Sequence, residues 1–290
     1  MRKDSLISII QNYTRESGVR GLEREIGKVF RKVVTQHERN KKKRITLITP
    51  KTLPKVLGAA RYHRMSAEQE DEVGVATGLG VTSSGGELLI IEVESMPGSA
   101  KRAVTGQLGE VMKESTKLAF SYIRSKADEF GILTSKMRQL DIHIHLPETA
   151  HPKEGPSAGV TLVTALLSSL TGIAVRKEVA MTGEITLRGL VLEVGGLKEK
   201  LLAAKRGGIK EVIIPKENEK DLAEVPDEIL RNMKILPVEK LDEVIAIALV
   251  EPPTPLTEEQ IKNEEKLLSD QKEKLFPPDQ GTGEDAHPTI

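Results

Sequence analysis

The chain has 290 residues, of which 43 are basic and 43 are acidic, so a net formal charge of zero gives no general attraction to nucleic acid or an anionic membrane. Cysteine is absent, which excludes disulfides, thiol catalysis and thiolate metal sites, and the hydrophobic content of 38% is enough for an aliphatic core. Because no apolar run is long enough to span a bilayer and no signal-peptide core follows the charged start, the sequence predicts a cytoplasmic protein without membrane contact.

Residues 1–67 are predicted to form a small all-α subdomain. Apolar residues recur at helical spacing near 6–10 and again at 19–34, where charged residues fill the opposite face. A basic, polar break at 40–44 separates these helices from a short strand expected at 45–48 and a helical turn or two at 51–57. Such a segment buries too little apolar surface to be stable alone, so we expect it to be part of a larger assembly.

From residue 68 to residue 251 strands alternate with helices, which predicts a mixed α/β domain of the α+β class. Strands are expected at 73–82 and 87–94, which form a hairpin, and at 140–146, 179–187, 211–215 and 234–237. Helices are expected at 108–130, at 160–167, at 197–205 and after each of the last two strands. The composition then turns to Pro, Glu, Lys, Asp and Gly, which predicts a disordered tail at 252–290 with one charged helix at 257–275.

The segment Gly155-Pro156-Ser157-Ala158-Gly159 lies directly before the apolar run at 160–167. Gly155 permits a sharp turn and Pro156 suits the first helical position, so Ser157 is predicted in the first turn of a buried helix. Free backbone N–H groups and the helix dipole favour negative charge there. Ser157 is therefore either an N-terminal cap, which is the commoner role, or a nucleophile whose oxyanion is stabilised by the start of the helix.

A histidine-dependent triad does not fit this sequence. The pattern matches the G-x-S-x-G nucleophile elbow of hydrolases, but a polar loop at 147–154 takes the place of the preceding strand, and the only later histidine, His287, lies in the predicted tail. A lysine can replace the histidine if burial keeps its amine neutral near pH 7. Lys200 borders an apolar helical stripe and is a candidate, although such lysines more often extend their amine into water.

Two other features point to binding more weakly. His143 and His145 are two residues apart on the strand expected at 140–146, so they share a face of it. A metal site needs a further ligand, and no metal-binding pattern surrounds the pair, so we expect packing or hydrogen bonding and no metal. The basic run at 41–44 is expected to be a solvated turn, and it gives only weak support for a nucleic-acid partner.

Several longer segments resemble the C-terminal part of Lon proteases, a family of ATP-dependent AAA+ serine proteases. The resemblance covers the chain from about residue 5 to 250, and its first segment is similar to the small helical subdomain of the Lon ATPase module. The segments that carry it are 13–24, 106–115, 152–159, 181–189 and 195–208. The family therefore implies a Ser-Lys protease domain preceded by a small all-α subdomain.

The resemblance also assigns roles to individual residues. It implies that Ser157 is the nucleophile and Lys200 the general base of a catalytic dyad. It makes Thr182 a partner that orients the lysine amine and places Glu154 near the site, where the family more often has Asp. Arg20 falls on the family's sensor arginine, which contacts nucleotide only in an intact ATPase module.

The sequence contains no nucleotide-binding motif of an ATPase. Without Walker A or Walker B motifs, the chain is expected to be a fragment that does not hydrolyse ATP itself. The family implies peptide hydrolysis without a cofactor, ATP and Mg²⁺ in the full-length enzyme, a hexameric ring, and unfolded or misfolded proteins or peptides as substrates in protein quality control and the stress response. Two alternatives remain open: a non-enzymatic ring-assembly module, and a nucleic-acid-binding regulator that acts through 41–44.

Overall fold

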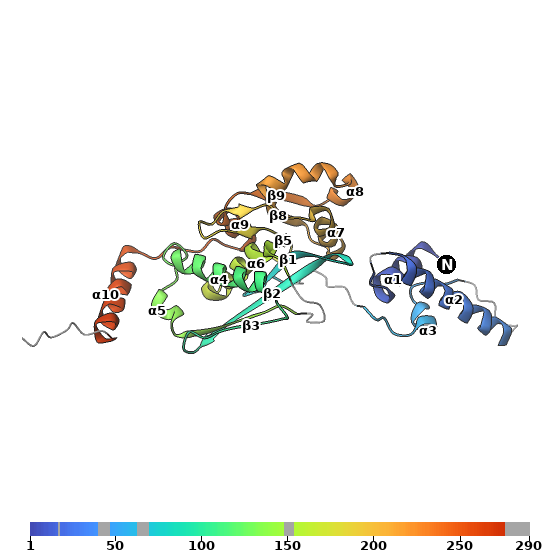
Figure 1. Cartoon of the computed structure of the whole chain (residues 1–290), viewed down its shortest axis with the longest axis horizontal. Coiled ribbons are helices and arrows are strands. Elements are labelled where there is room, and N and C mark those ends of the chain that lie inside the picture. The colour runs from blue at the N-terminus through green and yellow to red at the C-terminus, as the bar shows by residue number, and fades with distance from the viewer. Residues whose placement is uncertain (17, 40–46, 63–69, 148–153, 276–290) are drawn as a thin grey trace, which may run out of the picture.

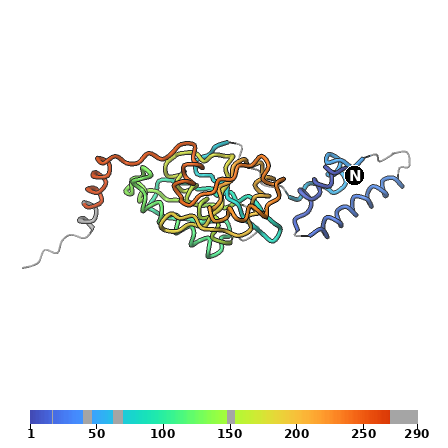
Figure 2. Tube along the Cα trace, turned by 90° about the horizontal axis from the view of Figure 1, so that it is seen from above, coloured from blue at the N-terminus to red at the C-terminus, as the bar shows by residue number. Residues whose placement is uncertain are grey.

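The computed structural model of the chain describes residues 1–16, 18–39, 47–62, 70–147 and 154–275. These residues form a helical unit, a mixed α/β domain and a C-terminal helix (Figure 1). Two perpendicular views place the helical unit at one end of the molecule, beside the tip of a β-hairpin, and the C-terminal helix at the opposite end (Figures 1 and 2).

The helical unit consists of α1 (Lys3–Tyr13), α2 (Arg20–Arg39) and α3 (Leu53–Leu57), which confirms the helices expected there. A small core holds them together, and its buried members are Ile9, Tyr13, Val29, Ile48 and Leu53. Residues 40–46, which include the basic run and part of the expected strand at 45–48, lie outside the described residues. The described residues 47 and 48 are not in a strand.

A seven-stranded sheet with the order β3-β4-β2-β1-β5-β8-β9 forms the centre of the α/β domain. The strands are β1 (Val75–Thr82), β2 (Gly85–Pro97), β3 (Arg102–Thr105), β4 (Leu140–His145), β5 (Val179–Met181), β8 (Glu211–Pro215) and β9 (Lys234–Val238). The β1–β2 and β2–β4 pairs are antiparallel, and the four other pairs are parallel. A separate hairpin pairs β6 (Glu184–Ile185) with β7 (Val191–Leu192). The predicted mixed α/β fold is confirmed.

Helices cover both faces of this sheet because successive strand side chains point to opposite sides. In β5, Val179 and Met181 join the core on one face, and Ala180 joins the core on the other. The first face is covered by α4 (Glu110–Ser125), α6 (Gly159–Thr171) and α9 (Leu241–Ala248). The second is covered by α7 (Leu197–Gly207), α8 (Asp227–Leu230) and the 3₁₀ helix η2 (Lys216–Glu224).

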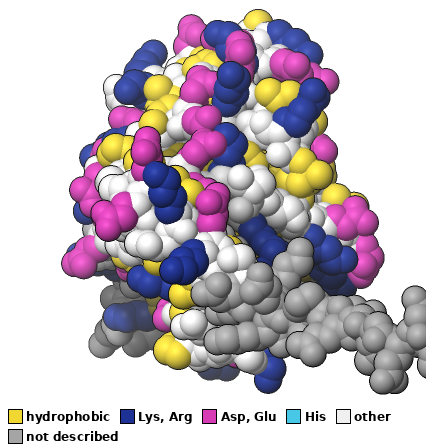
Figure 3. Space-filling view, turned by 90° about the vertical axis from the view of Figure 1, so that its left-hand side faces the viewer, with side chains coloured by type: hydrophobic (Ala, Val, Ile, Leu, Met, Phe, Trp, Pro, Cys, Tyr) yellow, Lys and Arg dark blue, Asp and Glu magenta, His cyan; other side chains and the backbone are white. Residues whose placement is uncertain are grey.

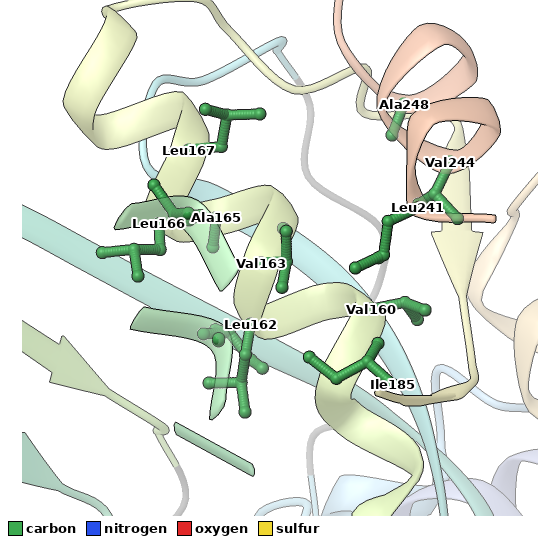
Figure 4. Packing of buried hydrophobic residues seen from close by; sticks show 14 of the residues in the cluster. Val160, Leu162, Val163, Ala165, Leu166, Leu167, Ile185, Leu241, Val244 and Ala248 are labelled. Carbon is green, nitrogen blue, oxygen red and sulfur yellow. The ribbon is translucent and has the colours of Figure 1, made fainter. Parts of the chain in front are cut away.

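The helix α6 lies in the middle of the first core. Every residue from Gly159 to Ser168 is buried, and Val160 and Val163 lie on the side of the helix that faces Leu241 of α9 (Figure 4). This confirms the buried helix that the apolar run predicts. A helix held on all sides cannot shift without disturbing the core, so the turn at its start has a fixed position.

Three predicted elements differ from the structure. The strand expected at 179–187 ends at Met181, because the Gly183 N–H turns away to donate to the Ser157 carbonyl and begins a connection to β6. The helix expected at 108–130 stops at Ser125, since Lys126 adopts φ −116° and ψ 17°. The strand β3 was not predicted, because all four of its residues are exposed and show no apolar alternation.

The C-terminal helix α10 (Glu258–Leu275) lies in the segment where the sequence predicts a charged helix at 257–275. Its Glu264 is buried, and the carboxylate accepts hydrogen bonds from the Ser135 N–H at 2.5 Å and the Ser135 hydroxyl at 2.7 Å at the start of α5 (Thr134–Met137). The face at this end of the molecule shows basic and acidic side chains interspersed (Figure 3). In the part of the chain that the structure describes, every helix falls short of the length and apolarity that a membrane span requires.

Candidate active site

Ser157 lies in the 3₁₀ helix η1 (Pro156–Ala158), which leads directly into α6. Gly155 before it has a φ of +102°, a conformation that residues with a Cβ rarely adopt, so the turn depends on this glycine. Pro156 occupies the first helical position, as predicted. The Ser157 hydroxyl makes no hydrogen bond to any described residue, and the caps of η1 and α6 are Gly155 and Ala158. The structure therefore does not give Ser157 the role of a helix cap.

The backbone at Ser157 is tied to the end of β5. The Ser157 carbonyl accepts a hydrogen bond from the Gly183 N–H at 2.9 Å and one from the Thr182 hydroxyl at 3.4 Å. The Val160 N–H in turn donates to the Gly183 carbonyl at 3.2 Å. These contacts hold the serine on the sheet while leaving its hydroxyl available.

Lys200 lies in the second turn of α7 with Leu197, Leu201 and Ala204 on the helix face that packs into the second core. Only 3% of Lys200 is exposed, and its amine has no hydrogen bond or ion pair among the described residues. Burial lowers the pKa of this amine from 10.5 to about 8, because the charged form loses its hydration. At neutral pH a useful fraction of the amine is therefore uncharged and able to accept a proton.

The tip of the β1–β2 hairpin closes over this part of α7. A side chain at Gly86 would overlap the Glu199 carbonyl and crowd the Lys200 N–H, so the two backbones lie in direct contact. Arg206 of α7 also donates to the Gly86 carbonyl at 2.9 Å. The burial of Lys200 thus depends on a hairpin that is distant from it in the sequence.

Ser157 and Lys200 line the same cavity of about 280 Å³, although their helices cover opposite faces of the sheet. Both helices contact β1, and the last three residues of this strand form part of the lining. The residues that complete the lining are Gly80, Val81, Thr82, Glu87, Leu89, Met112, Glu154, Pro156, Glu193, Val194 and Gly195. The cavity thus combines a free hydroxyl, a buried amine and room for a peptide segment.

The other residues that the resemblance named lie at different distances from this cavity. Glu154 lines it, with a carboxylate placed where a side chain at Gly109 would otherwise stand, beside the start of α4. Thr182 is buried next to Ser157, and no hydrogen bond joins it to Lys200 among the described residues. Arg20 begins α2 in the helical unit, is exposed and does not line the cavity.

The histidine pair is a hydrogen-bonded cluster on the sheet. The Thr105 hydroxyl lies 2.9 Å from His143 Nε2 and 2.7 Å from His145 Nδ1, which agrees with the hydrogen bonding predicted for these residues. Within the described ranges, no three His, Cys, Asp or Glu side chains are grouped so that they could hold a metal ion. The pair therefore belongs to the sheet and not to the cavity.

Sequence reasoning missed two carboxylates of the cavity, Glu87 and Glu193. Each is a single charged residue beside apolar neighbours, as an outward-facing glutamate of a strand would be, so no pattern marks either as a cavity residue. Glu87 also forms an ion pair of 3.0 Å with Arg15 of the helical unit. A second cavity of about 220 Å³ lies between this unit and the hairpin, and Thr82 and Glu87 line both cavities.

Comparisons with known proteins give matches over most of the chain. A family profile described as the Lon protease (S16) C-terminal proteolytic domain matches residues 47–251, and one described as the Lon protease AAA+ ATPase lid domain matches residues 1–45. The Lon protease of Rhizobium meliloti (strain 1021) is 54% identical over 252 residues, which are 87% of this chain and 31% of that protein. Lon protease 1 of Myxococcus xanthus is 55% identical over 246 residues, 85% of this chain and 30% of that protein. The chain thus spans about a third of the length of these relatives.

Proposed function

Because the chain belongs to the Lon protease family and carries its C-terminal proteolytic domain and lid domain, we propose that the cavity at Ser157 and Lys200 hydrolyses peptide bonds with a Ser-Lys dyad. The observation that supports this proposal best is the buried Lys200 amine, which shares a cavity with a serine hydroxyl that has no other partner among the described residues. A general base must be unprotonated at the working pH, and burial favours the neutral, unprotonated form of a lysine.

In the proposed reaction the neutral Lys200 amine takes the proton of the Ser157 hydroxyl while the oxygen attacks a peptide carbonyl carbon. The carbonyl oxygen becomes an oxyanion, which backbone N–H groups at the start of the helix stabilise, including that of Ser157. The lysine ammonium then returns the proton to the leaving nitrogen, the C–N bond breaks, and an acyl ester remains on Ser157. Water, deprotonated by the same amine, hydrolyses this ester.

Two neighbouring residues have supporting roles in the proposal. Thr182 holds the Ser157 carbonyl and thereby positions the nucleophile from the end of β5. Glu154 lies at the entrance to the turn and lines the cavity. Neither has to exchange a proton with the substrate.

Our proposals for substrates, assembly and location rest on the relatives, which are named Lon protease and are about three times as long as this chain. We propose unfolded or misfolded proteins and peptides as the substrates, a hexameric ring as the assembly, and a cytoplasmic location. ATP and Mg²⁺ act in the longer proteins, where Arg20 meets bound nucleotide; peptide hydrolysis by the dyad itself needs neither.

A serine-directed fluorophosphonate tests whether the site is an enzyme or only an assembly module. We expect one adduct on Ser157, located by peptide mass spectrometry, and protection of the serine by a peptide substrate. The Ser157→Ala variant should take up no label, whereas Ser121→Ala, which removes an exposed hydroxyl on α4, should be labelled like the parent chain. Absence of a Ser157 adduct would favour the non-enzymatic ring-assembly module.

The pH dependence of peptide hydrolysis should report the Lys200 amine. Because its pKa is about 8, kcat/KM is expected to rise about tenfold per pH unit below pH 8 and to level off above about pH 9. Initial rates on a peptide without titratable groups, measured from pH 6 to pH 10, give this profile. A rate that does not change between pH 6 and pH 9 contradicts lysine as the base.

A further inference from the structure

We propose that this cavity selects peptides by charge, accepting a basic side chain next to the scissile bond and excluding an acidic one. The proposal rests on the proposed function, since it names the substrate class of the same site. It starts from the charged residues of the lining, which are Glu87, Glu154, Glu193 and Lys200. When Lys200 is uncharged and acts as the base, every remaining charge among the described residues of the lining is negative.

The three glutamates do not form ion pairs with the Lys200 amine among the described residues. A carboxylate close to the amine would stabilise its charged form and raise the pKa, whereas burial is the only influence found on Lys200. The amine also forms no ion pair within the described part of the chain. Glu87, Glu154 and Glu193 thus contribute charge to the lining of the cavity without pairing with Lys200 among the described residues.

The described cations near Glu154 and Glu193 leave much of the charge of these two residues uncompensated. Glu193 pairs with Lys220 at 2.8 Å, but the Glu193 and Lys220 side chains are 55% and 66% exposed, so water weakens the attraction. Glu154 has no ion pair among the described residues. Only Glu87, which is 18% exposed and paired with Arg15, is partly shielded. Among the described residues of the lining, an acidic side chain would therefore meet three carboxylates and no cation other than Lys200.

The apolar part of the lining suits the stem of a basic side chain. Val81, Leu89, Met112 and Val194 stand among the glutamates around the same space. Lysine and arginine side chains pack their methylene stems on apolar surface while the charged end stays near water or a counter-ion. A long basic side chain can thus pack its stem on the apolar residues and place its charge near the glutamates. A glutamate side chain has a shorter stem and a charge that the glutamates repel.

The test is a series of internally quenched peptides that are identical except for Lys, Arg, Gln or Glu at one position beside the cleaved bond. We expect the order Lys and Arg, then Gln, then Glu in kcat/KM, with a Lys-to-Glu ratio of roughly tenfold at low ionic strength. The ratio should shrink at high salt, since the pocket is open to solvent. Fluorescence anisotropy of the same peptides with the Ser157→Ala variant should give the same order for affinity.

The Glu193→Gln variant should lower the Lys-to-Glu ratio by about twofold, because one of the three charges is removed. Glu224→Gln is the matched control, since Glu224 is an exposed glutamate that does not line the cavity, and the ratio should stay unchanged. Equal rates on the Lys and Glu peptides would overturn charge selection while leaving the peptidase proposal intact. If no peptide is cleaved, the peptidase proposal fails, and the anisotropy order alone decides whether the cavity selects by charge.

Discussion

Replacing Ser157 with alanine is expected to abolish peptide hydrolysis while the fold stays intact. The hydroxyl is the proposed nucleophile, so its loss should lower kcat by at least about 10⁴-fold, as in other covalent mechanisms. The same hydroxyl makes no hydrogen bond to a described residue, so its removal leaves no buried group without a partner. Rates on a quenched peptide and the thermal midpoint, followed by circular dichroism, measure the two effects.

The double variant Ser157→Ala with Lys200→Met sharpens this test. Residues that act as one unit do not lose activity additively, so the second substitution should add almost nothing to the first. A further large drop in rate would show that Lys200 acts on a reaction that does not pass through Ser157. Activity of the Ser157→Ala variant within tenfold of the parent chain would remove the serine from the mechanism.

Replacing Lys200 with methionine should have two effects of opposite sign. Loss of the general base should lower kcat by about 10²- to 10⁴-fold. At pH 7 the Lys200 amine is mostly protonated in both the folded and the unfolded chain. Protonation is weaker in the folded chain, because burial lowers the pKa of the amine from 10.5 to about 8. A buried ammonium therefore costs about 3 kcal/mol of stability, and methionine, which has a similar shape and no charge, should recover about 1–3 kcal/mol of it.

The pH dependence gives the sign of this effect. Between pH 8 and pH 10.5 the unfolded chain binds more protons at Lys200 than the folded chain does, so the stability of the parent chain rises with pH. The Lys200→Met variant lacks this rise, and its advantage should fade as the pH approaches 10.5. Urea unfolding at pH 7 and pH 9.5 measures the difference.

Lys198→Met is the control for these measurements, because Lys198 is exposed on the same helix. It should leave kcat unchanged and should change the free energy of unfolding by no more than about 0.5 kcal/mol. If Lys200→Met destabilises the chain at pH 7 by more than about 1 kcal/mol, its amine is not a buried, poorly solvated group, and the explanation for its low pKa is wrong.

Local sequence was sufficient for the parts of the site that depend on neighbouring residues. Gly155 and Pro156 predict the turn at Ser157, and the apolar run after it predicts a helix buried on all sides, because both signals lie within one segment. The mixed α/β fold follows from the alternation of strands and helices in the same way.

Features that depend on distant contacts were not accessible to this reasoning. Lys200 is buried because the hairpin tip at Gly86 packs on the backbone of α7, and no pattern near Lys200 records that contact. The strand at 179 ends early because Gly183 bonds to Ser157 across the core. The glutamates of the cavity have no periodic pattern, and only the three-dimensional arrangement brings Glu87 and Glu193 together.

The two residues of the proposed dyad come from the two helical layers of the α/β domain, with Ser157 in the turn before α6 and Lys200 in α7. In a partly folded chain with only the first layer formed, Ser157 has no base beside it. With only the second layer formed, Lys200 has no serine beside it, and a lysine exposed to water stays protonated. If the proposed dyad is the catalyst, peptide hydrolysis therefore requires both helical layers to be folded. A partly folded copy would then be unable to cleave the chains around it.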